Sequence, residues 1–201
     1  LYGTNQNFDV IIGDLFLPWK AGTSNLYSLE HFQTIRNSLT ADGIFMQWIP
    51  SAQITFTEFA IISRTMREVF PQVTIWLGDF SPGRSIIGLL GHQHPSSISE
   101  TAAKLDISRP EYNNASLPLL AHYIGNLDAA SFADYPVNRD NRPIIEYRAP
   151  IVNQNANARF TTYFSGENLI RYMVQNQQSF PHTEDVYLTE LQENISLLSQ
   201  V

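Results

Sequence analysis

Apolar and polar residues follow two different rhythms along the first ninety residues of the chain. Residues 8–14 read Phe-Asp-Val-Ile-Ile-Gly-Asp, an apolar run that is typical of a strand buried on both faces. We therefore expect this strand to lie inside a sheet, with a neighbour on each side. Comparable runs predict three more strands, at residues 43–49, 73–77 and 85–90.

Helical spacing of apolar residues separates these strands. The pattern of residues 29–39 predicts a helix that ends near Gly43, because glycine accepts the left-handed turn that terminates many helices. The apolar stripe of residues 59–70 predicts a second helix, with Thr55 or Thr57 as its N-cap. Alternating strands and helices indicate an α/β fold with a mostly parallel sheet and helices on its faces.

The pattern is less regular after the fourth predicted strand. Residues 92–118 are polar and contain prolines, which favours a surface excursion. Short helices are expected at 117–124 and 127–132, an extended segment at 142–147, and a helical tail from about residue 168.

These observations divide the chain into residues 1–150, which form the α/β domain, and residues 151–201, which form a helical tail. With 201 residues, of which 43% are hydrophobic, the chain is long enough to bury one substantial core. No window approaches 18 consecutive apolar residues, and the first residues do not resemble a signal peptide, so we expect this chain by itself to be soluble.

Composition excludes several function classes. The net charge is −7 and there is no basic run, which argues against a nucleic-acid partner. The chain has no cysteine, so it contains no disulfide, no thiolate nucleophile and no cysteine-ligated zinc. His92 and His94 alternate as two metal ligands on a strand would, but no third ligand has a useful spacing, and we predict no metal site.

Five segments, in order along the chain, closely resemble the second half of spermidine-synthase-like proteins. The segments are residues 9–20, 26–32, 42–50, 69–74 and 138–150, and they include Gly-Asp-Leu-Phe-Leu-Pro-Trp-Lys and Gly-Ile-Phe-Met-Gln-Trp-Ile-Pro. The resemblance covers roughly residues 8–150 and is closest to the branch that is fused to an amino-terminal membrane region. It implies a Rossmann-like sheet of the methyltransferase type.

The resemblance also implies a reaction, with two departures from the family pattern. The reaction is aminopropyl transfer from decarboxylated S-adenosylmethionine to a small amine. The family's glycine-rich cofactor loop and the acidic residue that follows it are not in this sequence, so we expect the chain alone to bind no such cofactor. Spermidine synthases usually carry a second Asp just before the proline of the loop, and Leu17 stands at that place.

The resemblance assigns roles to six residues. The catalytic residue is Asp14, the cofactor side is formed by Asp14 and Leu15, and the substrate side by Gln47, Trp48, Trp19 and Tyr27. A primary amine with a pKa of about 10 is protonated at neutral pH, and a carboxylate at the end of a strand can attract it and accept its proton. Structural roles compete with these assignments: Asp14 as a turn cap, Gln47 as a satisfied buried amide and Trp48 as a core residue.

Two other functions stay open. The chain can be a catalytically degenerate binding or assembly module, tethered to a membrane protein or complex through a partner or a fused membrane region. It can also be an S-adenosylmethionine-dependent methyltransferase on the same fold. An active enzyme would have a small amine as its partner, and the family resemblance allows a homo-oligomer.

Overall fold

The computed structural model describes residues 6–14, 16–79, 85–94, 123–127, 130–154 and 163–176. The strands are β1 (Phe8–Gly13), β2 (Leu39–Ile49), β3 (Gln72–Asp79), β4 (Ile86–His92) and β5 (Tyr123–Leu127). The α-helices are α1 (Leu29–Asn37), α2 (Phe56–Val69), α4 (Ile144–Gln154) and α6 (Gly166–Asn176). Two short 3-10 helices are η1 (Thr23–Tyr27) and η2 (Ser51–Gln53). Together they form a sheet flanked by helices, which confirms the α/β class.

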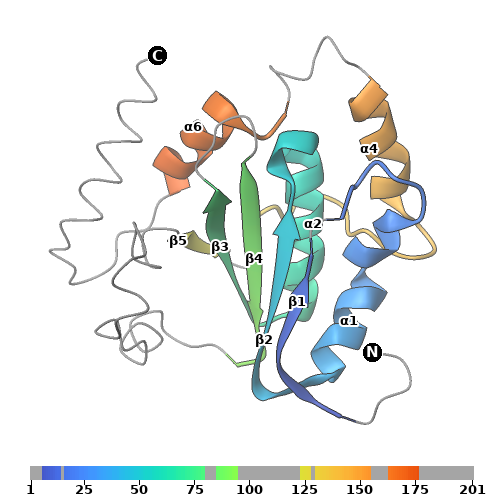
Figure 1. Ribbon diagram of the computed structural model, residues 1–201, viewed down its shortest axis with the longest axis vertical. Coiled ribbons are helices and arrows are strands. Elements are labelled where there is room, and N and C mark those ends of the chain that lie inside the picture. The colour runs from blue at the N-terminus through green and yellow to red at the C-terminus, as the bar shows by residue number, and fades with distance from the viewer. Residues whose placement is uncertain are drawn as a thin grey trace, which may run out of the picture.

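The five strands form one sheet in the order β1-β2-β4-β3-β5 (Figure 1). Only the pairing of β1 with β2 is parallel, whereas β2 with β4, β4 with β3 and β3 with β5 pair antiparallel. The expectation of a mostly parallel sheet is therefore wrong for the described pairings. The reason is that β4 begins only seven positions after the end of β3, too few for a parallel crossover, so β4 returns antiparallel to β3 and lies between β3 and β2.

The position of β1 differs from the sequence prediction. Among the described strands it pairs only with β2, so it lies at an edge of the sheet. Val10 is 53% exposed and Ile12 is 64% exposed. The apolar run shows that burial of these side chains is favourable, but it does not show that a neighbour is present to bury them. The expectation of a neighbour on each side is thus contradicted for this part of the chain.

One face of the sheet forms the core with the helices. Phe45 and Ile49 of β2 are fully buried, and a Cβ atom at Gly91 of β4 would lie 2.6 Å from the ring of Phe70, at the end of α2. On the opposite face Met46 and Trp48 are only half-buried. Successive side chains of a strand point to opposite faces of a sheet. Alternate side chains of β2 therefore lie on a packed face and on a partly exposed face.

The helix ends show which local sequence signals decide the boundaries. Thr55 is the N-cap of α2, as predicted, and its backbone N–H donates to Glu58 Oε2 at 3.0 Å in a capping box. The first helix ends at Asn37, earlier than the predicted end near Gly43, because the chain is already in β2 from Leu39 onward. The turn signal of residues 42 and 43 therefore lies inside a long strand.

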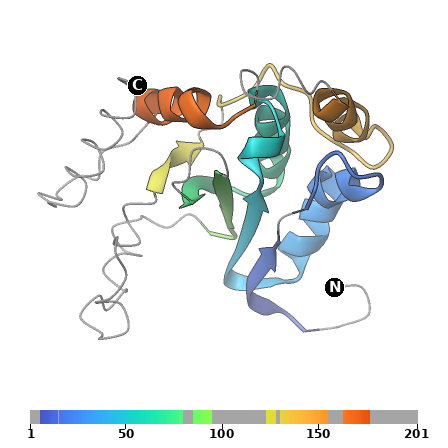
Figure 2. The ribbon, with the colours of Figure 1, turned by 45° about the horizontal axis from the view of Figure 1, so that its top comes forward.

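Three C-terminal predictions are wrong and one is confirmed. Residues 123–127 form strand β5 and residues 130–135 form turns instead of the short helices expected at 117–124 and 127–132, and residues 144–154 form helix α4 instead of an extended segment. Both elements are held by long-range contacts, β5 by its ladder with β3 and α4 by Arg148, whose Nε donates to the fully buried Glu58 at 2.8 Å. The helical tail is confirmed for α6, which approaches α2 in Figure 2.

Some predictions lie outside the described residues, namely the rest of the tail and most of the surface excursion at 92–118. The division at residue 150 stays a prediction, although α4 runs across it and Leu169 of α6 joins the hydrophobic core. Within the described ranges, no helix is both long enough and apolar enough to cross a membrane.

An aromatic cluster packs α2 against α6 and the residues before it, and its packing can be tested. The cluster includes Phe56, Phe59, Phe164 and Tyr172. Phe59 is fully buried with its ring centroid 4.6 Å from that of Phe164, whereas the neighbouring Phe56 is 36% exposed. We expect Phe59→Ala to lower the free energy of unfolding by about 3–5 kcal/mol through lost burial and a cavity. Phe56→Ala is the matched control and should cost about 1 kcal/mol. Equal losses for both variants in chemical denaturation would contradict this packing.

Candidate functional site

Asp14 follows the last residue of β1 and has an exposed side chain. Its backbone carbonyl accepts a hydrogen bond from Gln47 Nε2 at 3.2 Å, which joins the end of β1 to the interior of β2. Gln47 pairs with Gly13 in the parallel ladder. The side chain of Asp14 is thus exposed to solvent, while its backbone carbonyl is bonded to the side chain of Gln47.

Gln47 is fully buried, and its amide orientation is determined by its neighbours. Besides the bond to Asp14, Nε2 donates to the carbonyl of Trp48 at 3.0 Å. A flipped amide would place Oε1 against two carbonyl oxygens, so the nitrogen must face them. Oε1 then has no hydrogen-bond partner among the described residues, and it lies so near Gly13 that a Cβ atom there would be 2.5 Å away. Only glycine fits at position 13 without moving this side chain.

Trp48 points to the face of the sheet opposite to Gln47. Cβ atoms built at Gly78 and Gly88 would lie 2.7 Å and 3.0 Å from its ring, so the indole lies over these two glycines. Its half-buried side chain is therefore packed on the partly exposed face. Gln47 and Trp48 end the same strand but cannot approach one ligand from the same face.

The segment after Asp14, here called the β1–α1 loop, is described at residues 16–28 and is attached to two other elements, η2 and α4. Trp19 Nε1 donates to Gln53 Oε1 of η2 at 3.0 Å. The N–H of Gly22 donates to Glu146 Oε1 of α4 at 2.9 Å. Leu17, near the start of the loop, is 36% exposed. The loop therefore lies against the body of the protein, with a partly exposed apolar side chain close to Asp14 in the sequence.

Tyr27 provides an internal support for this loop. Its side chain is fully buried, and its hydroxyl donates to the carbonyl of Phe16 at 3.0 Å. The two rings also contact edge to face, with centroids 6.4 Å apart. Burial raises the pKa of the Tyr27 hydroxyl far above its usual range, so it stays a neutral donor. In this conformation Tyr27 holds the loop and does not face solvent.

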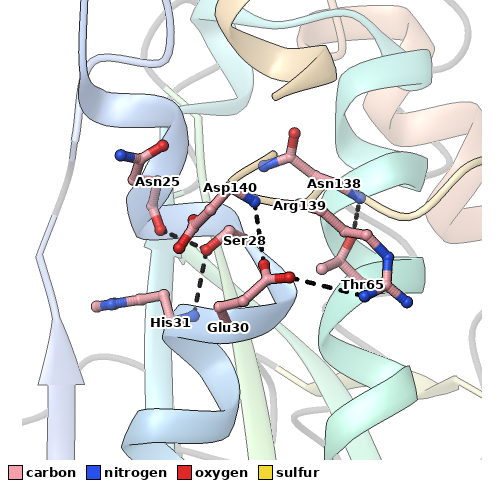
Figure 3. Close-up of polar contacts among 8 residues, drawn as sticks. All are labelled: Asn25, Ser28, Glu30, His31, Thr65, Asn138, Arg139 and Asp140. Atoms are coloured by element: carbon pink, nitrogen blue, oxygen red, sulfur yellow. Dashed lines mark hydrogen bonds and ion pairs between the residues drawn. The ribbon is translucent and has the colours of Figure 1, made fainter. Parts of the chain in front are cut away.

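Asn138 joins the loop to three helices, and Figure 3 shows its bond to Thr65 of α2. It is fully buried, and its Nδ2 donates to the carbonyls of Ser24 at 3.0 Å and of Tyr27 at 3.2 Å. Its backbone N–H donates to Thr65 Oγ1 of α2 at 2.9 Å, and its Oδ1 accepts from the N–H of Ile145 in α4 at 3.2 Å. Its backbone carbonyl accepts from the first residue of α1 at 2.9 Å. Every polar group of Asn138 thus has a partner on another element.

A more exposed set of charges surrounds the start of α1 (Figure 3). Glu30 accepts from the backbone N–H of Asp140 at 3.0 Å and lies 3.6 Å from Arg139. The half-buried His31 has a lowered pKa because burial disfavours its charged form, and this outweighs the opposing attraction of Asp140. Residues 139–142 form a turn, closed by backbone bonds between Arg139 and Arg142.

The structure brings together only part of the predicted site. Asp14 and Gln47 are adjacent, Trp19 and Tyr27 belong to the β1–α1 loop, and Trp48 lies on the other face. Leu15 lies outside the described residues. His92 is buried near Thr74 and has a pKa lowered by burial, whereas His94 is exposed 3.8 Å from Asp42. The described residues contain no group of three metal-binding side chains.

Sequence reasoning did not identify Asn138. Its only local signal was its place at the start of the segment 138–150, one of the five that carry the family resemblance. Its partners lie up to 114 residues away in the sequence, so no local pattern could reveal them.

Comparison with known proteins supports part of the resemblance. Residues 1–77 match the sequence model of the spermine/spermidine synthase domain, and this part contains Asp14, Gln47 and Trp48. No curated protein matches the chain. The membrane-fused branch and the resemblance beyond residue 77 stay predictions.

Two solved structures are similar to the chain. They are a spermidine synthase in complex with the transition-state analogue AdoDATO, with a TM-score of 0.39, and the spermidine synthase from Thermotoga maritima, with a TM-score of 0.40. Each is 23% identical, and the similarity covers 50% of this chain and 34% or 35% of the other. This chain spans about a third of their length.

The contact between Gly13 and Gln47 gives a test of the site geometry. We expect Gly13→Ala to lower the free energy of unfolding by about 1–3 kcal/mol, because the added methyl group displaces the buried amide. In a Gln47→Ala background the same substitution should cost much less, since the obstructing atoms are gone. A double-mutant cycle by chemical denaturation measures this coupling. Fully additive costs would show that the two residues do not compete for the same space.

Proposed function

We propose that this chain carries the amine-binding side of an aminopropyltransferase-like site, with Asp14 as the general base. The single observation that supports this most directly is the position of Asp14, exposed at the end of β1 on a backbone held by Gln47. The match of residues 1–77 to the spermine/spermidine synthase domain supports the assignment of the reaction class.

The proposed reaction needs a deprotonated amine. The carboxylate of Asp14 attracts the substrate ammonium group and accepts one of its protons. The freed lone pair attacks the propyl carbon that is bound to the sulfonium of decarboxylated S-adenosylmethionine. The new C–N bond forms as the C–S bond breaks, and the bonding electron pair stays on sulfur, which leaves as a neutral thioether.

The residues around Asp14 have different roles in this proposal. Trp19 is half-buried and tied to Gln53, so it can limit the access of water to the amine. Gln47 holds the backbone of Asp14, and Tyr27 acts on the loop through Phe16. The prediction that Asp14 and Leu15 also lie against the donor belongs to this proposal. The predicted contact of Trp48 with the amine is left out of it, because the Trp48 ring lies over Gly78 and Gly88 on the face opposite to Gln47.

The net charge of the chain and the apolar side chain of Leu17 together narrow the class of acceptor amine. The net charge of −7 attracts cationic amines at long range. The exposed Leu17 next to the site offers the amine an apolar contact where spermidine synthases usually offer a second carboxylate. We therefore propose an acceptor amine with fewer positive charges, or a longer apolar part, than those of authentic spermidine synthases.

Replacement of Asp14 tests the proposed base. We expect Asp14→Asn in the full-length protein to keep the fold and to lower turnover by roughly 100- to 10,000-fold, because the amide keeps the shape but cannot accept the proton. Asp9→Asn is the matched control, since the exposed Asp9 lies on the same strand and its carboxylate accepts from Thr40 Oγ1 at 2.8 Å, away from the end of the strand. Turnover is measured with decarboxylated S-adenosylmethionine and a series of amines. Undiminished turnover in Asp14→Asn would remove Asp14 from the mechanism.

Replacement of Leu17 tests whether the loop faces the amine. Leu17→Asp should tighten the binding of putrescine and spermidine by roughly 1–3 kcal/mol, the usual strength of a hydrogen bond to a charged group. Leu17→Asn adds polarity without charge and should gain much less. Calorimetric titration compares the two variants with the parent. If Leu17→Asp binds these amines no more tightly than Leu17→Asn, the loop does not face an amine site, and a binding or assembly role gains support.

A further inference from the structure

We propose that Asn138 is a positioning residue for the β1–α1 loop, and that it acts on the segment next to Asp14 through Tyr27. This inference rests on the proposed function only for its consequence in catalysis. The structural part, which is that a distant buried amide holds the loop, stands on contacts of this chain and is tested separately.

The side-chain amide of Asn138 connects it to η1. The Nδ2 group donates to two carbonyls of this short helix, those of Ser24 and Tyr27. A 3-10 helix of five residues has few internal bonds, so external donors contribute a large part of its stability. Asn138 itself is anchored through Thr65 and Ile145, which belong to α2 and α4.

Tyr27 connects η1 to the residues beside Asp14. With its backbone fixed by Asn138, the buried Tyr27 projects its hydroxyl to the carbonyl of Phe16, two residues after Asp14. The loop therefore has a buried support next to Asp14. The attachment through Gly22 is exposed and competes directly with water, whereas the attachment through Trp19 is part-buried, as is the bond from Tyr27 to Phe16.

A positioning role of Asn138 differs in one measurable way from a general contribution to the stability of the fold. Asn138 and Tyr27 form a series, so loss of either one releases the same support at Phe16. If both residues act through the same support, the free-energy costs of the two substitutions at the loop do not add. The costs of two independent losses of stability do add. The coupling between Asn138 and Tyr27, measured at the loop itself, therefore distinguishes the two roles.

The test uses the full-length protein and amide hydrogen exchange at Lys20 and Thr23, whose N–H groups bond within the loop at 3.0 Å and 3.1 Å. Asn138→Asp keeps the acceptor for Ile145 but loses the donor to η1, and Tyr27→Phe loses only the hydroxyl. Each variant should lower protection at these two amides by roughly tenfold, the effect of one lost hydrogen bond. The double variant should match the more affected single variant within roughly threefold.

A matched control lies next to Asn138 in the sequence. Arg139→Gln removes an exposed ion pair with Glu30 and should leave protection in the loop unchanged. Losses that multiply in the double variant, or unchanged loop protection with faster exchange throughout α2, would overturn the inference. If Asn138→Asp does not fold, Tyr27→Phe is the deciding variant. Unchanged protection at Lys20 and Thr23 in that variant would show that Tyr27 does not support the loop, and the inference would fail.

Activity provides a separate readout. With decarboxylated S-adenosylmethionine and putrescine as probes, Asn138→Asp and Tyr27→Phe should lower kcat by similar factors, with a smaller change in KM, while Arg139→Gln keeps the parent kcat. A parent protein without activity would remove the proposed function but leave the exchange result standing. An active protein whose kcat is unaffected by an opened loop would overturn the positioning role and leave the proposed function intact.

Discussion

The parallel pairing of β1 with β2 is the constraint on which the candidate site depends. It places Gly13 beside Gln47, and the missing side chain of the glycine makes room for the buried amide. That amide holds the carbonyl of Asp14, so the strand ends with its carboxylate exposed and its backbone fixed. A larger residue at position 13 or a rotated amide at position 47 would disturb both. The chemistry proposed for Asp14 therefore begins with the packing of the half-buried Gly13 against the buried amide of Gln47.

The C-terminal half of the described chain completes this arrangement from the other side. The segment that follows Tyr135 brings Asn138 against η1 and α1, and α4 adds Glu146, which binds the loop at Gly22. Arg148 joins the same helix to the buried Glu58 of α2. A loop that carries a reactive group needs such supports, because each free residue would otherwise add conformational entropy that has to be overcome when substrate binds. The long-range contacts supply the rigidity that the loop sequence alone does not.

How much of this was predictable depends on the range of the interactions. The helices of residues 29–37 and 56–69 follow from their apolar stripes, and Thr55 from the chemistry of caps. Residues 123–127 and 144–154 were misread, because their structure depends on a strand partner and on the ion pair of Arg148 with the buried Glu58, and neither is visible locally. At the site, Asp14 and Gln47 followed from the family resemblance. Asn138 did not, since the partners of its side chain are brought to it only by the folded chain.

The most direct test of this account is a crystal structure of the full-length protein with a bound polyamine. The account predicts that an amine nitrogen lies within about 3 Å of a carboxylate oxygen of Asp14, the distance of a charge-assisted hydrogen bond. It also predicts that the carbonyl of Asp14 keeps its bond to Gln47. A polyamine bound elsewhere, with Asp14 turned away from it, would contradict the central claim that this strand end is built to receive an amine.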